Sequence, residues 1–398
     1  MPRASLAASL VASLAVGCSS SPAPAPQGAG RAGSAAEASA AAPSSAGAAA
    51  VSPSAPATTS TSSAPPTPPA SSRPRRWLRG STHVHARPSG DSSTEISDVI
   101  AWYERHGYDF IALTDHNRVS ELTPQSSTLG APAVRGPAQG LIVLAGIELT
   151  HNPGSCWPAP PTPSGKCRIH VNALGVTARP IDRLEWAERR STARLDQYTR
   201  ALQTAGELGG VAQLNHPQWH WGMSAELLTE LARRGARLVE IANVQFASWN
   251  AGDGVAPSME ALWDAALASG VDLWAVASDD AHSYDVAGPY PAGGGWVMVQ
   301  AEREPASIVA ALAAGRFYAS TGVSLARAEQ DGADLVVEIS PQSEGRHRIA
   351  FYENGAQVAE ADGPVARRAV PARGYVRAVV TRHDGAKAWV QPARRAPR

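Results

Sequence analysis

Seven short apolar runs alternate with helical stretches from residue 76 onward, and this alternation limits the possible folds more than any other feature. Each run ends in a polar cluster, as a buried strand does when it reaches the edge of a sheet. Strands that alternate with helices predict an α/β fold with a parallel sheet, and seven strands suffice for a closed or nearly closed β/α barrel. The runs are "WLRGSTHVHA", "YDFIALTDHN", "LIVLAGIELT", "IHVNALGV", "GVAQLNHP", "LVEIANV" and "LWAVASDDAH".

Helical stretches separate several of these runs. The stretch at 92–107 opens with Ser92 and Glu95 at the spacing of a capping box, which predicts a helix start there. Further helices are predicted in "RLDQYTRALQTAGELGG", "SAELLTELARRG" and "SMEALWDAALASG".

Histidines and acids gather at the ends of the predicted strands, where the active sites of β/α barrels lie. His83 and His85 alternate at the first strand end, so their side chains project to one face, as two ligands of one metal ion would. Each such residue alone is ordinary, because a lone His is usually a satisfied core or surface group and a strand-end Asp often caps a helix. Together they predict a shared site, which the later runs extend with Asp115, His116, Glu148, His170, His216, Asp280 and His282.

Five motifs in this order, "HVHA", "TDHN", "GIELT", "NHP" and "SDDAH", resemble those of the PHP (polymerase and histidinol phosphatase) domain over about residues 78 to 320. The resemblance implies a distorted seven-stranded β/α barrel with a multinuclear metal site. The segment "GRFYASTG" at 315 to 322, with the export signal described below, is similar to the carbaryl hydrolase-like branch.

The resemblance also implies a ligand set that shares Glu148 between two ions. Asp91 lies six residues after His85, where the family usually has an acid five residues on. Asp115 and Asp279 are candidates for a supporting role in catalysis. Asp115 would orient the imidazole of the adjacent His116. Asp279 would hold a metal ligand through a hydrogen bond or would cap a helix. The implied ligands are His83, His85, Glu148 and Asp280 for one ion, Glu148, His170 and His216 for a second, and Asp91, His116 and His282 for a third.

Imidazoles combined with bridging carboxylates suit two or three divalent ions of Zn, Mn or Fe. Two ions roughly 3.5 to 4 Å apart would lower the pKa of a bridging water and polarise a scissile bond. We therefore expect a metal-dependent hydrolase that acts on a small-molecule ester through a metal-bridging hydroxide, most simply a phosphoesterase. The alternatives are an ester or carbamate hydrolase of the same superfamily and a non-catalytic metal-binding surface module. Arg87, Arg118, His220 and Trp221 are candidates for lining the mouth of the site.

The N-terminal part predicts export. Residues 1–18 read as a signal peptide whose "AVGC" ending resembles a lipobox with Cys18 as the lipidated residue, although Ala15 stands where Leu is typical. Residues 19–75 are rich in Ser, Ala and Pro and predict a disordered linker. We expect a periplasmic or cell-surface protein, including an outer-membrane lipoprotein, that meets the membrane only through this anchor. The 35 basic and 35 acidic residues balance, which argues against a nucleic-acid partner.

Residues 76–322 would form the metallohydrolase barrel and residues 323–398 a small antiparallel β domain, because the pattern becomes strictly alternating and two hairpin signals, Asn354-Gly355 and Asp384-Gly385, appear. This domain carries no candidate ligand, so a packing role is expected, with carbohydrate or surface binding as the alternative. Cys156 and Cys167 bracket a Pro-rich loop and would form a disulfide in an oxidising compartment, or remain free thiols in the cytosol.

Overall fold

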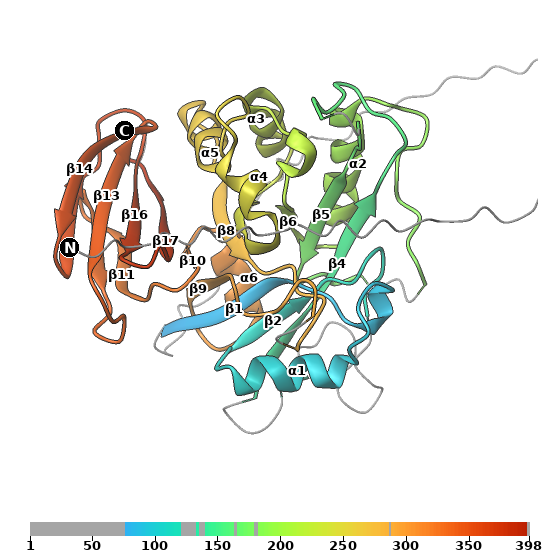
Figure 1. Ribbon diagram of the computed structural model, residues 1–398, viewed down its shortest axis with the longest axis horizontal. Coiled ribbons are helices and arrows are strands. Elements are labelled where there is room, and N and C mark those ends of the chain that lie inside the picture. The colour runs from blue at the N-terminus through green and yellow to red at the C-terminus, as the bar shows by residue number, and fades with distance from the viewer. Residues whose placement is uncertain are drawn as a thin grey trace, which may run out of the picture. The chain divides into compact units, whose positions relative to one another are not determined.

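All seven predicted strands are present and belong to one large mixed sheet (Figure 1). The computed structural model describes residues 76–120, 133–134, 140–162, 165–178, 182–285 and 288–395. The predicted signal peptide, Cys18 and the predicted linker lie outside the described residues. The strands are β1 (Arg76–Val84), β2 (Phe110–Leu113), β4 (Ile142–His151), β5 (Ile169–Leu174), β6 (Val211–Leu214), β7 (Leu238–Asn243) and β8 (Trp274–Ser278).

The sheet is not parallel throughout, so that part of the expectation is wrong. β1, β2 and β4 run parallel, as do β6, β7 and β8, but β5 is antiparallel to both β4 and β6. A parallel neighbour needs a long crossover, usually a helix, and no helix lies between β4 and β5 in the residues the structure describes there. The reversal brings the start of β5 beside the end of β4, with Thr150 paired to His170.

The first and last of the seven strands approach each other without sharing a ladder within the described chain. A single parallel bridge joins Val84 to Ala281, and the amide of His85 donates to the carbonyl of Ala281 at 3.0 Å. On its other edge β1 pairs with β9 (Trp296–Ala301), and β9 pairs with β10 (Phe317–Ser320). The ends of β1 and β8 therefore meet, which places the polar clusters after them in one region. The two-residue strand β3 (Ala133–Val134) pairs with β4.

Helices cover the sheet through apolar faces. In α3, Leu228 and Leu231 are fully buried, as is Trp263 of α5. Ser224 and Ser258 cap these two helices by accepting backbone N–H bonds from Leu227 and Ala261. The helices are α1 (Ile96–Arg105), α2 (Arg194–Glu207), α3 (Ala225–Arg233), α4 (Ala247–Ala251), α5 (Met259–Ala268) and α6 (Pro305–Ala313), with 3-10 turns η1 (Arg87–Ser89), η2 (Trp219–Trp221) and η3 (Val244–Phe246).

The capping box predicted at the first helix does not form. Glu95 is the N-cap of α1, and its side chain makes no capping bond. Ser92 instead donates its hydroxyl to the carbonyl of His282 at 2.8 Å. This bond ties the segment that follows η1 to the segment that follows β8.

Four of the C-terminal strands extend the large sheet, and three form a separate one. β17 (Lys387–Ala393) pairs with β10, and β16 (Val376–Arg382), β13 (His347–Glu353) and β14 (Ala356–Asp362) follow outward. Both predicted hairpins are confirmed, with Asn354-Gly355 joining β13 to β14 and Asp384-Gly385 lying between β16 and β17. A second, three-stranded antiparallel sheet contains β11 (Leu325–Asp331), β12 (Asp334–Ile339) and β15 (Val365–Ala369).

A buried ion pair joins this C-terminal region to the helices. The guanidinium of Arg377, on β16, donates to both carboxylate oxygens of Asp264, on α5, with both distances 2.6 Å.

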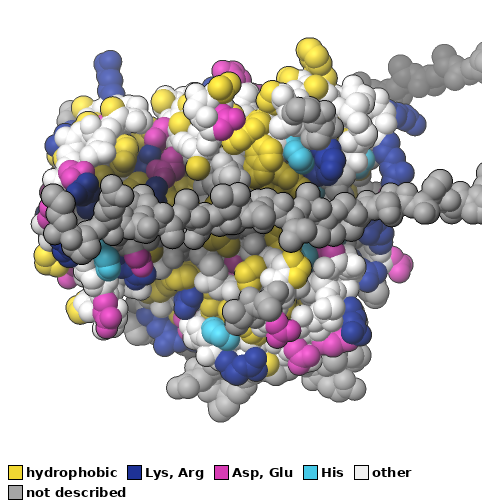
Figure 2. All heavy atoms as spheres, viewed as in Figure 1, with side chains coloured by type: hydrophobic (Ala, Val, Ile, Leu, Met, Phe, Trp, Pro, Cys, Tyr) yellow, Lys and Arg dark blue, Asp and Glu magenta, His cyan; other side chains and the backbone are white. Residues whose placement is uncertain are grey.

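On the face of the molecule seen in Figure 2, basic and acidic side chains are interspersed. Among the described residues, no helix is both long enough and apolar enough to cross a membrane.

Candidate metal centre

Nine side chains from six strands or the segments after them meet at one end of the large sheet. They form four overlapping groups, and in each group the ligand atoms lie within 4.8 Å of one another. These nine side chains are the candidate metal ligands named from the sequence, and the structure brings all of them together. The groups are His83, His85 and Glu148; His83, His216 and Asp280; Glu148, His170 and His216; and His85, Asp91, His116 and His282.

The deepest part of the cluster pairs two imidazoles with two carboxylates. His83 Nε2 lies 3.1 Å from Asp280 Oδ1 and 3.4 Å from Glu148 Oε1. His85 Nε2 lies 3.3 Å from the same Asp280 oxygen and 3.7 Å from Glu148 Oε2. The side chains of both histidines are fully buried. His83 and His85, two positions apart in the sequence, therefore direct both rings toward the same Asp280 oxygen, as predicted.

Glu148 continues the cluster toward the two histidines contributed by β5 and the segment after β6. Its Oε1 lies 3.0 Å from His170 Nδ1 and 3.8 Å from His216 Nε2. His170 stands at the start of β5, yet it reaches the same end as the other residues because β5 is reversed relative to β4. His170 Nε2 lies within hydrogen-bonding distance, 2.9 Å, of Asn152 Oδ1.

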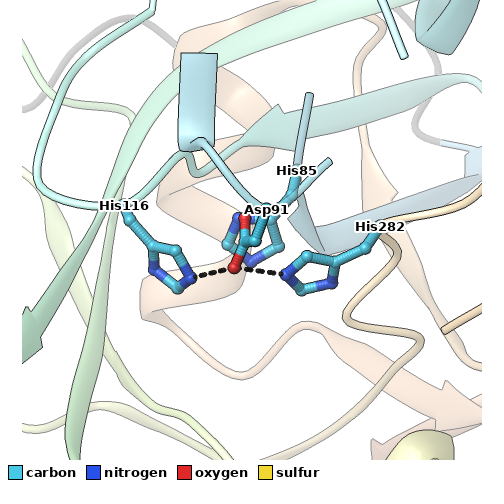
Figure 3. A group of neighbouring side chains, drawn as sticks. All are labelled: His85, Asp91, His116 and His282. Carbon is cyan, nitrogen blue, oxygen red and sulfur yellow. Dashed lines mark hydrogen bonds and ion pairs between the residues drawn. The ribbon is translucent and has the colours of Figure 1, made fainter. Parts of the chain in front are cut away.

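The most exposed group is centred on Asp91 (Figure 3). His116 and His282 approach one carboxylate oxygen of Asp91 from opposite sides, with Nε2 to Oδ2 distances of 2.9 and 3.2 Å. His85 stacks on His282 with ring centroids 4.2 Å apart and links this group to the buried one. The Asp91 side chain is 46% exposed, so the cluster opens to solvent on this side.

The backbone is strained at two candidate ligands, His216 and Asp280, and at Asn117, the residue after the candidate ligand His116. Asn117, His216 and Asp280 adopt positive φ angles of 54°, 26° and 47°. Non-glycine residues with such angles cost about 1–3 kcal/mol each and persist where the surrounding structure imposes them. All three residues follow strands that end at the cluster. The strain therefore lowers local stability in the segments that carry the candidate ligands.

Glu240, in the middle of β7, was not predicted. It is fully buried, and its Oε1 accepts the Nδ1–H of His83 at 2.7 Å and the hydroxyl of Ser278 at 2.6 Å. Its Oε2 accepts the backbone N–H of His216 at 2.6 Å. The one acidic residue in the apolar run "LVEIANV" was the available signal, because a charged side chain is rarely buried without a partner.

Amide side chains supply further support to Glu148. Asn215 donates its Nδ2 to Glu148 Oε1 at 2.9 Å and to Asn172 Oδ1 at 2.8 Å. Asn172 in turn donates to the carbonyl of Thr82, which precedes His83. These hydrogen bonds hold the Glu148 carboxylate, which belongs to two of the groups, in one orientation.

The charges of the cluster are mutually dependent. Burial disfavours the charged forms of Glu148 and Asp280, but the surrounding imidazoles outweigh it and lower both pKa values. Burial also opposes the charged form of His116, yet Glu148 and Asp91 raise the pKa of His116 to about 10. Burial, aided by the nearby His282, lowers the pKa of His85 to about 3. The carboxylates are therefore ionised, and His85 is a neutral imidazole, the form that binds metals.

Asp115 and Asp279, the predicted catalytic acids, belong to none of the four groups found among the described residues. Asp115 accepts hydrogen bonds from the backbone N–H of Ala86, at 2.7 Å, and from the hydroxyl of Ser120. These bonds fix the segment after His85; the predicted orientation of an imidazole by Asp115 stays a prediction. Burial raises the Asp115 pKa to about 6.

Asp279 points to a different set of partners. It accepts the hydroxyls of Ser81 at 2.8 Å and Tyr103 at 3.1 Å, and the backbone N–H of Gly293 at 2.7 Å. Burial raises its pKa to about 6. Its contacts join β1, α1 and the segment before β9, so it supports the scaffold directly behind Asp280.

The donor set fits divalent metal ions. His83 Nε2 and His85 Nε2 are buried and make no hydrogen bond of acceptable geometry among the described residues, although both face carboxylate oxygens. Buried polar atoms without hydrogen bonds are costly unless another partner, such as a metal ion, satisfies them. The imidazole and carboxylate donors, with no thiolate in any of the four groups, suit Zn, Mn or Fe.

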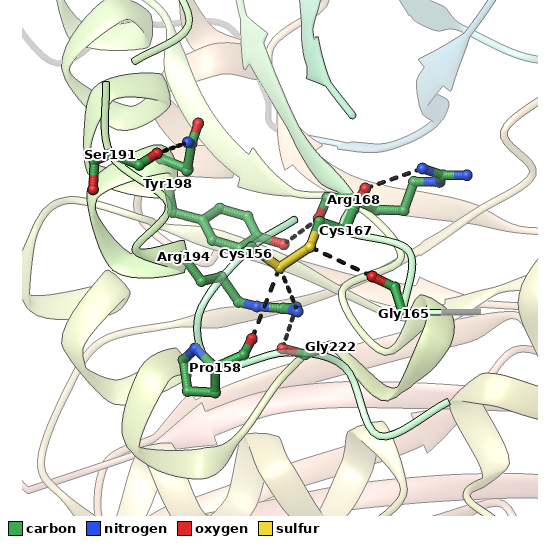
Figure 4. Close-up of a disulfide and its surroundings, with 10 residues drawn as sticks. Cys156, Pro158, Gly165, Cys167, Arg168, Ser191, Arg194, Tyr198 and Gly222 are labelled. Carbon is green, nitrogen blue, oxygen red and sulfur yellow. Dashed lines mark hydrogen bonds between the residues drawn. A yellow bond between two sulfur atoms is a disulfide. The ribbon is translucent and has the colours of Figure 1, made fainter. Parts of the chain in front are cut away.

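A disulfide lies in the connection between β4 and β5 (Figure 4). Cys156 and Cys167 are bonded, with their Cα atoms 6.0 Å apart, so the expected pairing is confirmed. The bond closes the connection between β4 and β5, the hairpin that carries Glu148 and His170. Arg194 of α2 donates to Cys156 Sγ at 3.1 Å and to the carbonyl of Gly222.

Of the four residues predicted at the mouth, Arg87 forms an ion pair with Glu95 on the exposed surface. Arg118 is half-buried, and His220 and Trp221 lie in η2, directly after the segment that carries His216.

No family model and no curated protein sequence matches this chain.

Proposed function

We propose that this chain is a metal-dependent hydrolase of the PHP type that binds two or three divalent cations and acts on phosphate esters. The observation that carries the proposal is the position of Glu148, whose carboxylate belongs to both the His83–His85 group and the His170–His216 group. A site for a single structural ion does not need a carboxylate between two sets of imidazoles. A carboxylate in this position suits a hydrolytic site in which two or more ions lie close together.

Divalent cations held in these groups would supply Lewis-acid polarisation of the scissile phosphoryl group and a water of lowered pKa. The chain itself would orient this chemistry. Asp91, His116 and His282 form the solvent-exposed side, where an ester would enter, and burial of His83, His85 and Glu148 excludes bulk water from the inner side. Glu240 and Asn215 hold the inner ligands from behind.

We also propose that the protein is exported and anchored at the membrane through Cys18. The disulfide between Cys156 and Cys167 supports an oxidising compartment. The signal-like residues 1–18 support the route. Mass spectrometry of the N-terminal peptide from membrane fractions tests this proposal: a diacylglyceryl group on Cys18 is expected, and an unmodified Cys18 would contradict it.

The hydrolase proposal is tested with the full chain reconstituted with Zn, Mn or Fe. The substrates are p-nitrophenyl phosphate, bis-p-nitrophenyl phosphate and a naphthyl carbamate. Phosphate ester hydrolysis that requires metal and is lost in Glu148→Gln, but not in the exposed control Glu360→Gln, is the expected result. Turnover of the carbamate alone would move the assignment to the ester and carbamate hydrolases. Equal rates for wild type and Glu148→Gln on every substrate would count against an enzyme at this site.

A further inference from the structure

Three aromatic side chains stand beside the metal centre and form what we call the aromatic wall: Trp219, Phe246 and Tyr290. They come from η2, η3 and the segment after β8, three separate connections on the side of the sheet that carries the cluster. Trp219 and Phe246 have ring centroids 4.9 Å apart, and Phe246 and Tyr290 6.5 Å apart. The three rings therefore form a continuous aromatic cluster, in which Trp219 and Tyr290 are accessible to solvent.

The wall contacts the candidate ligands directly. Phe246 lies 4.5 Å from the ring centroid of His216, and Trp219 lies 5.3 Å from it at an interplanar angle of 87°. Trp219 also contacts His170 at 5.9 Å, and Tyr290 contacts His282 at 5.4 Å. A group attached to a reacting atom at the cluster would reach the wall within the length of a few bonds.

Packing of the protein core does not explain the positions of Trp219 and Tyr290; Phe246, which contacts both, is only 6% exposed. None of the three belongs to the hydrophobic core clusters formed by the described residues. Tyr290 is 42% exposed and Trp219 is half-buried. In Figure 2, hydrophobic side chains reach the surface over the part of the molecule that Figure 1 labels α4. Apolar surface left accessible beside a polar cluster is typical of a ligand site.

The backbone under the wall is strained. His220, Trp221 and Tyr290 have φ angles of 58°, 57° and 53°. Bulky side chains rarely adopt this left-handed region, and such outliers gather at functional sites. Trp221 and Trp249 form a separate aromatic pair, with ring centroids 4.5 Å apart, and His220 lies between this pair and the wall because its ring contacts both Trp219 and Trp249. The protein thus holds several rings near the cluster at an energetic cost.

We propose that the aromatic wall seats an aromatic ring of the substrate, so that the substrates are aryl esters, and aryl phosphates in particular. This inference rests on the proposed function. In the reaction the bond between phosphorus and the aryl oxygen breaks and a water oxygen bonds to phosphorus. One water proton ends on the phenol oxygen and the other is shared with the phosphate and solvent, so no oxidant or reductant is needed. Stacking between rings supplies affinity that an alkyl ester lacks.

The neighbouring charge agrees with an anionic ester rather than a cationic ligand. The guanidinium of Arg168 lies 4.8 Å from the Trp219 ring centroid. A positive group on the wall repels a quaternary ammonium, although such cations also bind aromatic surfaces. The same positive charge attracts a phosphate monoester.

The test compares the binding of phenylphosphonate and methylphosphonate to the metal-reconstituted full chain by isothermal titration calorimetry. Neither probe is hydrolysed, so turnover does not enter. We expect phenylphosphonate to bind at least about tenfold more tightly. Trp219→Leu should abolish most of this preference, measured as the ratio of the two affinities in the same variant. Trp219→Phe should retain it, and Trp157→Leu, a change at a 72% exposed tryptophan, should have no effect.

The outcomes separate the two proposals. If methylphosphonate binds and phenylphosphonate binds no more tightly in the wild type, the aromatic wall proposal is overturned while the proposed function stands. A full preference for phenylphosphonate in Trp219→Leu would overturn the aromatic wall proposal in the same way. If neither phosphonate binds to the metal-loaded wild type, both proposals fail. The wild-type comparison does not depend on whether any variant folds.

Discussion

His83 donates its Nδ1–H to Glu240 Oε1 across 2.7 Å, which leaves Nε2 of the same ring facing Glu148 and Asp280. This single bond fixes both the tautomer and the direction of the inner imidazole. Metal-binding histidines usually have such a partner, because a carboxylate behind the ring raises its basicity and limits its rotation. Glu240 is thus a positioning residue for the cluster rather than a ligand.

Glu240→Gln should weaken metal binding by about 10- to 100-fold, because the amide keeps the size of the side chain but loses the charge that orients His83. Competition with a chromophoric chelator measures the change. Glu338→Gln, in β12 and remote from the cluster, is the matched control and should leave affinity unaltered. Wild-type affinity in Glu240→Gln would show that His83 does not depend on this carboxylate.

Asp91→Asn should remove one equivalent of metal and leave the others bound. Asp91 forms ion pairs with the partly buried His116 and His282 and belongs to the outer group alone, whereas Glu148 and Asp280 belong to the inner groups. Metal content after gel filtration measures the effect, with exposed Asp272→Asn as the control. Loss of every equivalent, or of none, would contradict a separable outer subsite.

Replacing Cys156 and Cys167 together by Ser should lower the free energy of unfolding by about 2–3 kcal/mol, since the disulfide closes a loop of 11 residues' separation. Urea denaturation of the metal-free protein measures this change. Unchanged stability of the double variant would mean that the hairpin between β4 and β5 is already constrained without the bond.

Asp264→Ala should destabilise the protein by about 3–5 kcal/mol, because it leaves the guanidinium of Arg377 buried without its bidentate partner. The double variant Asp264→Leu with Arg377→Met removes both charges and should recover much of the loss. Urea denaturation again provides the measurement. A loss below about 1 kcal/mol in the single variant would assign this pair the small value of an exposed salt bridge.

The sequence predicted much of the metal centre because one geometric rule covers most of it. Parallel strands end at the same edge of a sheet, so residues such as His116 and His216, placed just after strands, had to converge once the strands were recognised. His170 did not obey this rule, since it begins its strand. It reaches the site only because β5 runs in the opposite direction. The resemblance to a family implied that His170 is a ligand, but neither it nor the apolar pattern predicted this reversal.

The supporting contacts were harder to predict because their partners are distant in the sequence. Ser81 and Asp279 are 198 residues apart, and His83 and Glu240 are 157 apart. Local patterns such as the Ser92–Glu95 spacing carry no information about such partners, and here Ser92 bonds to His282 rather than capping α1. The extension of the large sheet by β17 likewise depends on pairing with β10, which no local signal encodes.

The number of metal ions bound per chain tests the shared metal centre most directly. Inductively coupled plasma mass spectrometry of the full chain, purified without chelator and then supplied with Zn, Mn or Fe, measures it. Two or three equivalents per chain are predicted for the wild type, and fewer for Glu148→Gln, because this carboxylate belongs to two of the four groups. Less than one equivalent in the reconstituted wild type would contradict the shared metal centre.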